Sequence, residues 1–118
     1  MPEEVELRPI IVTKELDSLA SGSTDTAEFK FSKPYRVKAI LFNRDDGQPW
    51  TGSLCTVQVG REYLTDGSTP VSAFGTDWMT RLPLDITLPA NVGMKVALTN
   101  GEGTTITAYV TAVLEPME

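Results

Sequence analysis

One run near the C-terminal end of the sequence limits the possible folds most, because apolar and polar residues alternate along it. Apolar residues occupy every second position from Ile106 to Leu114, and Thr107, Tyr109 and Thr111 lie between them. Neighbouring side chains of a β-strand point to opposite faces of a sheet. The run therefore predicts a strand that buries one face in a core.

Shorter runs of the same kind recur along the chain, separated by segments rich in Gly, Pro, Asn and Asp. Thr, Val and Ile, which favour strands, supply 30 of the 118 residues. Segment 12–20 also fits a helix, but it is short and ends in Ser-Gly-Ser, so a strand is preferred there. We expect eight strands, at about residues 8–16, 24–32, 35–43, 54–60, 69–75, 82–88, 93–99 and 104–114.

Two local patterns carry specific predictions. In segment 35–42 the alternation places Tyr35, Val37, Ala39 and Leu41 on one face of a strand. The pair Asn100-Gly101 lies between the last two expected strands. It predicts a tight hairpin turn, because both residues tolerate positive φ.

The spacing of the strands predicts the fold class. No helix is available for a parallel crossover, so we expect an all-β, two-sheet antiparallel β-sandwich. About eight strands favour a jelly roll, and an immunoglobulin-like sandwich is the alternative. The length of 118 residues fits one domain, residues 1–118.

Charge is distributed unevenly along a chain whose net charge is −6. Residues 1–28 contain seven acidic and two basic residues, whereas residues 29–44 contain five basic and no acidic ones. We expect neighbouring strands of opposite sign to pair across a sheet. A bipolar surface that docks onto further copies or a partner is the alternative. The negative charge argues against nucleic acid and anionic membranes as partners.

The sequence shows no targeting or membrane signal. No apolar run approaches the roughly 18 residues that span a bilayer, and the acidic start is unlike a signal peptide. Cys55 is the single cysteine, so no internal disulfide can form and synthesis in the cytoplasm fits best. The acidic segment 1–9 is a candidate for an N-terminal arm that becomes ordered against a neighbour.

The residues for catalysis are few. The chain contains no histidine, which removes imidazole-based triads and the usual zinc ligand sets. Cys55, Val57 and Val59 occupy every second position of an expected strand and so share its core-facing side. We therefore expect a buried, inert thiol. The chain is therefore not expected to be an enzyme, and no catalytic residue, cofactor or metal ion is predicted.

The loop at residues 43–48 has some features of a calcium site. Asp45 and Asp46 supply carboxylate oxygens beside a glycine turn. The loop lacks the spaced ligands of an EF-hand, and Arg44 repels a cation. A solvated turn is therefore the preferred interpretation.

Aromatic residues gather in and beside the turn-rich segment 44–81. Together with the acidic loop they form the candidate contact set, which is Trp50, Trp78, Tyr63, Phe74, Asp45 and Asp46. A sugar ring can stack on Trp50 while Asp45 and Asp46 hold its hydroxyls. The preferred interpretation is that the rings plug the ends of the sandwich or lie at a subunit interface.

The run Phe29-Lys30-Phe31-Ser32-Lys33-Pro34, the alternating strand after it and the Thr-rich closing strand resemble a known group of proteins. They are similar to small jelly-roll virion proteins of tailed phages, the head decoration or cement proteins and related fibre and spike modules. The similarity covers about residues 8–114. It implies a cysteine-poor protein, made in the host cytoplasm, that trimerises and clamps neighbouring capsid subunits.

Two functions are expected from these observations. The first is a structural virion protein of the decoration or cement type, a homotrimer that binds capsid or other virion subunits. The second is a monomeric carbohydrate-binding sandwich that uses Trp50 and the adjacent acidic loop. No functional residue is carried over from the resemblance.

Overall fold

A computed structural model describes residues 10–117, which form nine β-strands and a single turn of 3-10 helix. The elements in chain order are β1 (Ile10–Leu19), β2 (Thr24–Phe29), β3 (Tyr35–Arg44), β4 (Leu54–Val59), β5 (Glu62–Tyr63), β6 (Thr69–Pro70), η1 (Val71–Ala73), β7 (Ile86–Leu88), β8 (Met94–Thr99) and β9 (Ile106–Pro116). The candidate N-terminal arm, residues 1–9, lies outside the described residues. Over residues 10–117, no helix has the length and hydrophobicity that crossing a membrane requires.

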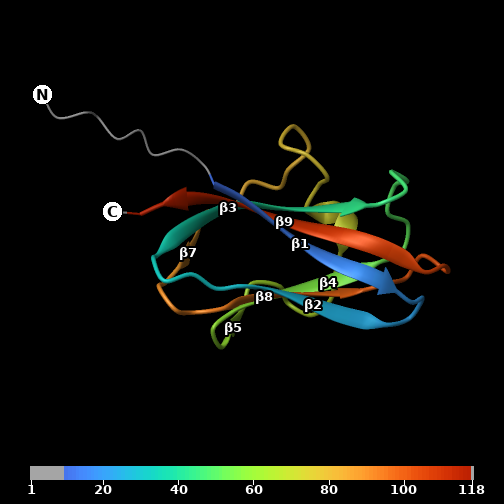
Figure 1. Cartoon of the computed structure of the whole chain (residues 1–118), viewed down its shortest axis with the longest axis horizontal. Coiled ribbons are helices and arrows are strands. Elements are labelled where there is room, and N and C mark those ends of the chain that lie inside the picture. The colour runs from blue at the N-terminus through green and yellow to red at the C-terminus, as the bar shows by residue number, and fades with distance from the viewer. Residues whose placement is uncertain (1–9, 118) are drawn as a thin grey trace, which may run out of the picture.

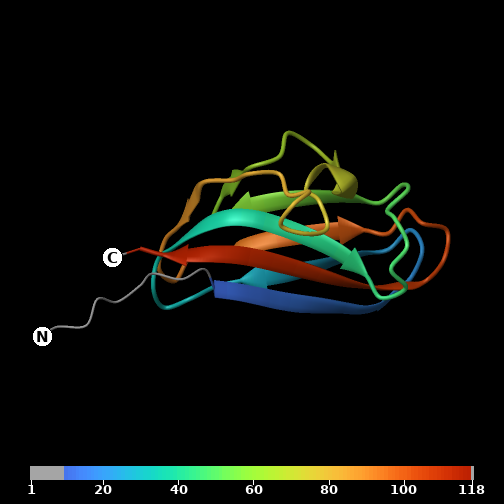
Figure 2. The same ribbon diagram turned by 90° about the horizontal axis from the view of Figure 1, so that it is seen from above.

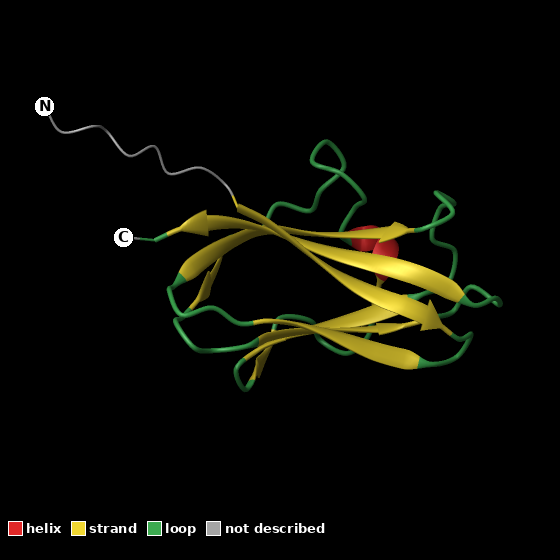
Figure 3. Cartoon of the chain, in the orientation of Figure 1, coloured by secondary structure: helices red, strands yellow, loops and turns green. Residues whose placement is uncertain are grey.

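The strands form two antiparallel sheets that face each other (Figures 1 and 3). Sheet A has four strands in the order β1-β9-β3-β7. Sheet B has the path β2-β8-β4-β5, and β6 also pairs with β4. The prediction of an all-β, two-sheet antiparallel sandwich is confirmed.

The pairing pattern identifies the topology. Strands pair from the ends of the chain inward: β1 with β9, β2 with β8, β3 with β7, and β4 with β5. The chain is thus a long hairpin wrapped over itself, with β9 also against β3 and β8 against β4. This nested, wrapped arrangement is a jelly roll, as the strand count predicts.

The core lies between the two sheets and is continuous. Its largest fully buried side chains are Phe29 from β2, Phe42 and Ile40 from β3, Leu88 from β7, Met94 and Leu98 from β8, and Leu114 from β9. Along β9 the alternating apolar residues from Ile106 to Leu114 are all buried. The prediction that this run forms a strand with one face in the core is therefore confirmed.

The predicted alternation along segment 35–42 is wrong, because β3 contains a bulge. The register with β9 shifts between Val37 and Ala39, so one extra residue, Lys38, lies in β3. An extra residue reverses which later side chains face the core. Val37 points into the core, but beyond the bulge Ile40 and Phe42 take that place. Ala39 and Leu41 lie on the other face, in a small cluster with Val113.

Several strand limits differ from the prediction. Of the expected strand at 82–88 only Ile86–Leu88 pairs, and the expected strand at 69–75 is β6 followed by η1. The two-residue strand β5 was not predicted. Residues 12–20 form β1 and its end, not a helix. Short strands at sheet margins depend on what lies beside them, which local preference does not encode.

The hairpin predicted at Asn100-Gly101 is also wrong. β8 belongs to sheet B and β9 to sheet A, so the connection crosses from one sheet to the other. Asn100 is fully buried, and its side-chain amide donates to the carbonyls of Leu19 at 2.8 Å and Thr104 at 2.7 Å. Asn100 therefore anchors the loop that crosses between the two sheets. The Asn-Gly pair in the sequence gives no sign of this role.

Candidate functional site

The six candidate contact residues lie in three separate regions. Trp50, Asp45 and Asp46 belong to the loop between β3 and β4, and Tyr63 lies in β5 at the margin of sheet B. The other two are found between η1 and β7. Of these, Phe74 is buried and packs edge-to-face on Phe42 at 5.5 Å, whereas Trp78 is exposed. The structure does not bring the six into one site.

Trp50 is partly buried and is held in place by the protein. Its indole Nε1–H donates to the Phe42 carbonyl at 3.0 Å, and the ring packs against the core. The Arg44 guanidinium lies 5.9 Å from the ring centroid. A sugar ring needs an accessible aromatic face, so this geometry does not favour Trp50 as a sugar-stacking residue.

The two loop aspartates make separate contacts within the protein. Asp46 pairs with Arg44 at 2.8 Å and accepts the Gln48 N–H at 3.0 Å. The hydrogen bond from Gln48 lowers the pKa of Asp46 most, and the contact with Arg44 adds to this effect, against an opposing effect of burial. Asp45 donates its N–H to Thr107 of β9 at 3.0 Å. Within residues 10–117 no group of three or more Asp, Glu or Cys side chains is arranged to bind a metal ion.

The most heavily hydrogen-bonded side chain in this region is Glu102, in the loop between β8 and β9, which the sequence analysis missed. Only 1% of the side chain is exposed. Oε1 accepts from Arg44 Nη1 at 2.9 Å, from the Thr51 N–H at 2.9 Å and from Thr51 Oγ1 at 2.8 Å. Oε2 accepts from the Gly52 N–H at 3.0 Å, the Ser53 N–H at 2.9 Å and Ser53 Oγ at 2.6 Å.

These six hydrogen bonds set the protonation state of Glu102. Burial alone would raise the pKa of the carboxyl group, but the hydrogen bonds from Ser53, Gly52 and Thr51 outweigh it and lower the pKa to about 2. The ionised side chain fixes the β3–β4 loop onto the β8–β9 loop. Its surroundings are fully occupied by protein groups, so the role is structural.

Cys55 behaves as its alternation predicts. The side chain is 2% exposed within the core of β4. Burial raises the pKa of the Cys55 thiol to about 12. A thiolate is the nucleophilic form, so a buried thiol with a raised pKa is unreactive at neutral pH.

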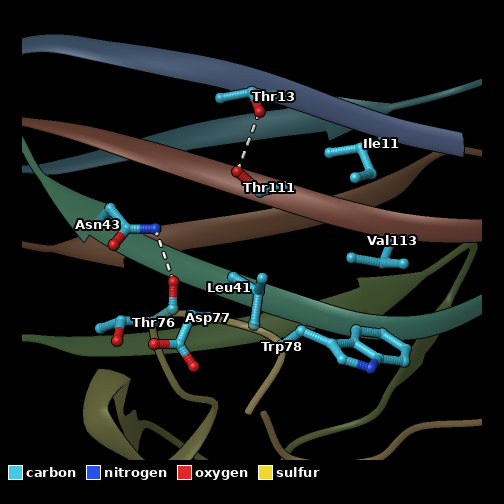
Figure 4. Close-up of a pocket in the computed structure, with 9 residues that line it drawn as sticks. All are labelled: Ile11, Thr13, Leu41, Asn43, Thr76, Asp77, Trp78, Thr111 and Val113. Carbon is cyan, nitrogen blue, oxygen red and sulfur yellow. Dashed lines mark hydrogen bonds between the residues drawn. The ribbon is translucent and has the colours of Figure 1, made fainter. Parts of the chain in front are cut away.

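The main concave surface is a groove on the outer face of sheet A, with a volume of about 530 Å³ (Figure 4). Its floor comes from β1, β9 and β3, and its wall from the loop between η1 and β7. The lining residues are Ile11, Thr13, Leu41, Asn43, Thr76, Asp77, Trp78, Thr111 and Val113. Most of the exposed lining surface is apolar, although five of the nine lining residues are polar.

The strand registers explain how the floor of the groove forms. Ile11 lies opposite Val113, which lies opposite Ala39, so these three make one row across the sheet. Thr13, Thr111 and Leu41 make the next row. The bulge in β3 turns Ala39 and Leu41 outward. Sequence alternation alone assigned these two residues to the same face as Val37, so it gave no sign of this groove.

The loop that forms the wall is held by a hydrogen bond from β3 and by contacts within the loop. The Asn43 amide donates to the Thr76 carbonyl at 2.9 Å, as Figure 4 shows. The Asp77 carboxylate accepts from the Thr80 N–H at 2.9 Å, and hydrogen bonds from Thr80 lower the pKa of Asp77. The Arg81 guanidinium lies 3.7 Å from the centroid of the Trp78 ring. Trp78 nevertheless remains 45% exposed.

The charged blocks do not pair as neighbouring strands. β9 separates β1 from β3, so the acidic first block does not lie beside the basic second block in sheet A. Instead Arg36 and Lys38 both contact Asp85, at 3.3 Å and 3.6 Å. Arg44 pairs with Asp46 and Glu102. Among the ion pairs of residues 10–117, the basic residues of β3 contact acids from later in the chain.

No family model, curated protein or solved structure matches this chain. The resemblance to phage virion proteins therefore stays a prediction.

Proposed function

We propose that the chain is a non-catalytic structural module that associates with copies of itself and binds other subunits of a virion, as decoration or cement proteins do. One observation carries this proposal: large apolar side chains are exposed in the groove on the outer face of sheet A and on the loop beside it. Ile11 at 67% and Trp78 at 45% line the groove, and Met79 at 88% and Leu82 at 41% lie in the same loop as Trp78. Such a patch on a small domain marks an interaction surface.

The thiol and carboxylate groups outside the groove support a structural role. Cys55 is buried, and Glu102 is enclosed by its own hydrogen bonds. The carboxylates of Asp46 and Asp77 are engaged within their own turns. The described residues thus offer no convergent set of a nucleophile, a base and an oxyanion donor that a hydrolytic site needs.

The carbohydrate alternative is less well supported by the geometry. Trp50 donates its indole N–H within the protein and packs on the core. Trp78 is the more exposed tryptophan of the two, and Arg81 stacks on it. A sugar-binding role would therefore need Trp78, and the Trp50 loop would not take part.

The first test is the mass of the protein in solution, measured by light scattering during size exclusion over a range of concentrations. We expect a multiple of the 12.9-kDa monomer that persists at high salt, because the exposed surface is apolar. A monomer at every concentration would contradict self-association. A monomer whose Trp78 fluorescence responds to a glycan would favour the carbohydrate function instead.

A further inference from the structure

The strand β1 is the longest open edge among the described parts of the two sheets. It has ten residues and pairs with β9 alone, so half of its backbone N–H and C=O groups point away from sheet A. The opposite edge of the sheet, β7, has three residues. Proteins usually protect long edges with proline, bulges, short strands or charged side chains, above all lysine. From Ile10 to Leu16 the edge has no proline and no bulge, its charged side chains are Lys14 and Glu15, and the first irregularity follows Leu16.

An apolar row of side chains ends at this edge without a neighbour. Ala39 is fully buried and Val113 is 5% exposed, but Ile11 at the end of the row is 67% exposed. Side chains directly opposite on adjacent strands stabilise a sheet by about 0.2–1 kcal/mol per pair. Another strand beside β1 would cover Ile11.

We propose that β1 pairs with β1 of a second copy of this chain, in antiparallel orientation about a two-fold axis at Thr13, and so joins the two four-stranded sheets into one. This inference deepens the proposed self-association and rests on it. The partner is a second copy because an antiparallel edge is self-complementary: each strand offers the other the same open row of donors and acceptors.

The register follows from the shape of the edge. The regular ladder runs from Ile10 to Leu16, and its midpoint is Thr13. Centring the pair on Thr13 uses the whole regular segment. It places Ile10 opposite Leu16, Ile11 opposite Glu15 and Val12 opposite Lys14 of the second copy. It also places Thr13 opposite Thr13, an uncharged and β-branched pair. Centring on Lys14 instead would oppose two like charges, which destabilises a sheet.

The edge strand of sheet B, β2, offers a comparison within the same molecule. It pairs with β8 alone and has six residues. Its outward side chains, Thr24, Thr26 and Glu28, are polar and exposed. It therefore lacks both the length and the exposed apolar row of β1, and Thr26 gives a matched control position for Thr13.

The first experiment compares masses by light scattering. We expect a dimer of about 26 kDa, twice the 12.9-kDa monomer. The variant Thr13→Lys should be monomeric, because it places two lysines opposite each other at the two-fold axis. Thr26→Lys, on β2, should remain a dimer. Thermal unfolding of each variant checks that the fold is kept.

The second experiment tests the register. A Thr13→Cys variant oxidised with diamide should form a disulfide-linked dimer, because directly opposed strand residues have Cα atoms about 4.5–5.5 Å apart, within disulfide range. Thr26→Cys should not. The native Cys55 is buried and does not compete.

The outcomes separate this inference from the proposed function. A wild-type monomer contradicts both. A trimer, or any oligomer whose mass is unchanged by Thr13→Lys, supports self-association but overturns the pairing of β1 edges. A dimer that dissociates in the lysine variant but gives no Thr13→Cys cross-link overturns the register.

Discussion

Ser53 Oγ donates a 2.6 Å hydrogen bond to Glu102 Oε2, and the two residues are 49 positions apart in the sequence. Through this contact and five others to the same carboxylate, the loop after β3 is fixed to the loop after β8. The two loops close the same end of the jelly roll, at the right in Figure 1. Glu102 is therefore a fixed point of the fold, and several predictions depend on it.

Replacing Glu102 with Gln should destabilise the protein by about 3 kcal/mol. The amide NH₂ would face N–H and O–H donors, and the buried Arg44 would lose a carboxylate partner at 2.9 Å. Breaking a buried ion pair by changing one partner costs about 3–5 kcal/mol. Urea unfolding measures the loss. A Glu28→Gln variant, changed at an exposed site of β2, is the control and should unfold like the wild type.

Stability should fall in acid because of the same group. The pKa of Glu102 is about 2 in the folded protein, below its usual 4.5. A lowered folded pKa contributes stability above the unfolded pKa, and that contribution is lost as pH falls from about 4.5 toward 2. The full contribution is about 3 kcal/mol, from about 1.4 kcal/mol per pKa unit. Unfolding free energies measured from pH 6 to pH 2 should show this loss in the wild type.

The Glu102→Gln variant is the control for the pH series. It lacks the titrating carboxyl, so its stability should depend much less on pH over the same interval. Parallel curves for the two proteins would show that other acids cause the loss.

Gly101→Ala should destabilise the same loop junction. A Cβ at Gly101 would overlap the Gly52 carbonyl, which is backbone and is held by the Glu102 contacts. Overpacking of this kind costs about 1–3 kcal/mol. Gly93→Ala is a matched control, because its Cβ would meet the end of the Glu28 side chain, which is exposed and can move. Thermal unfolding of the two variants should show the larger fall for Gly101→Ala.

The two tryptophans should differ in access to solvent. Trp50 packs on the core and is hydrogen-bonded to Phe42, whereas Trp78 is 45% exposed. Acrylamide should quench the fluorescence of the Trp50→Phe variant, which keeps Trp78, more strongly than that of Trp78→Phe. Equal quenching at low protein concentration would contradict the placement of Trp50. Trp50→Phe should also lose about 1 kcal/mol of stability, because the Phe42 carbonyl loses its donor.

Cys55 should be inert in the folded protein. Its side chain is 2% exposed, and burial raises its pKa to about 12. A chromogenic disulfide reagent at pH 8 should react with the thiol only in denaturant. Rapid reaction under native conditions would show that β4 opens readily or that the thiol is accessible.

The sequence by itself determined the fold class and the buried face of the closing strand. Alternation in the run that ends at Leu114, together with frequent turn residues, predicted an antiparallel sandwich, because a strand buries every second residue. It also placed Cys55 inside. These features are local, so neighbouring residues carry enough information to predict them.

Tertiary structure decided the rest. The bulge at Lys38 reversed the faces of Ala39 and Leu41, and it depends on how β3 pairs with β9. Asn100-Gly101 became a crossing between sheets, and Glu102 became buried, because loops distant in sequence supply their partners. The groove and the open edge of β1 exist only once strands from both ends of the chain lie side by side, as Figure 2 shows. A sequence pattern reports the period of each strand, whereas register, bulges and buried polar contacts arise from pairs of distant segments.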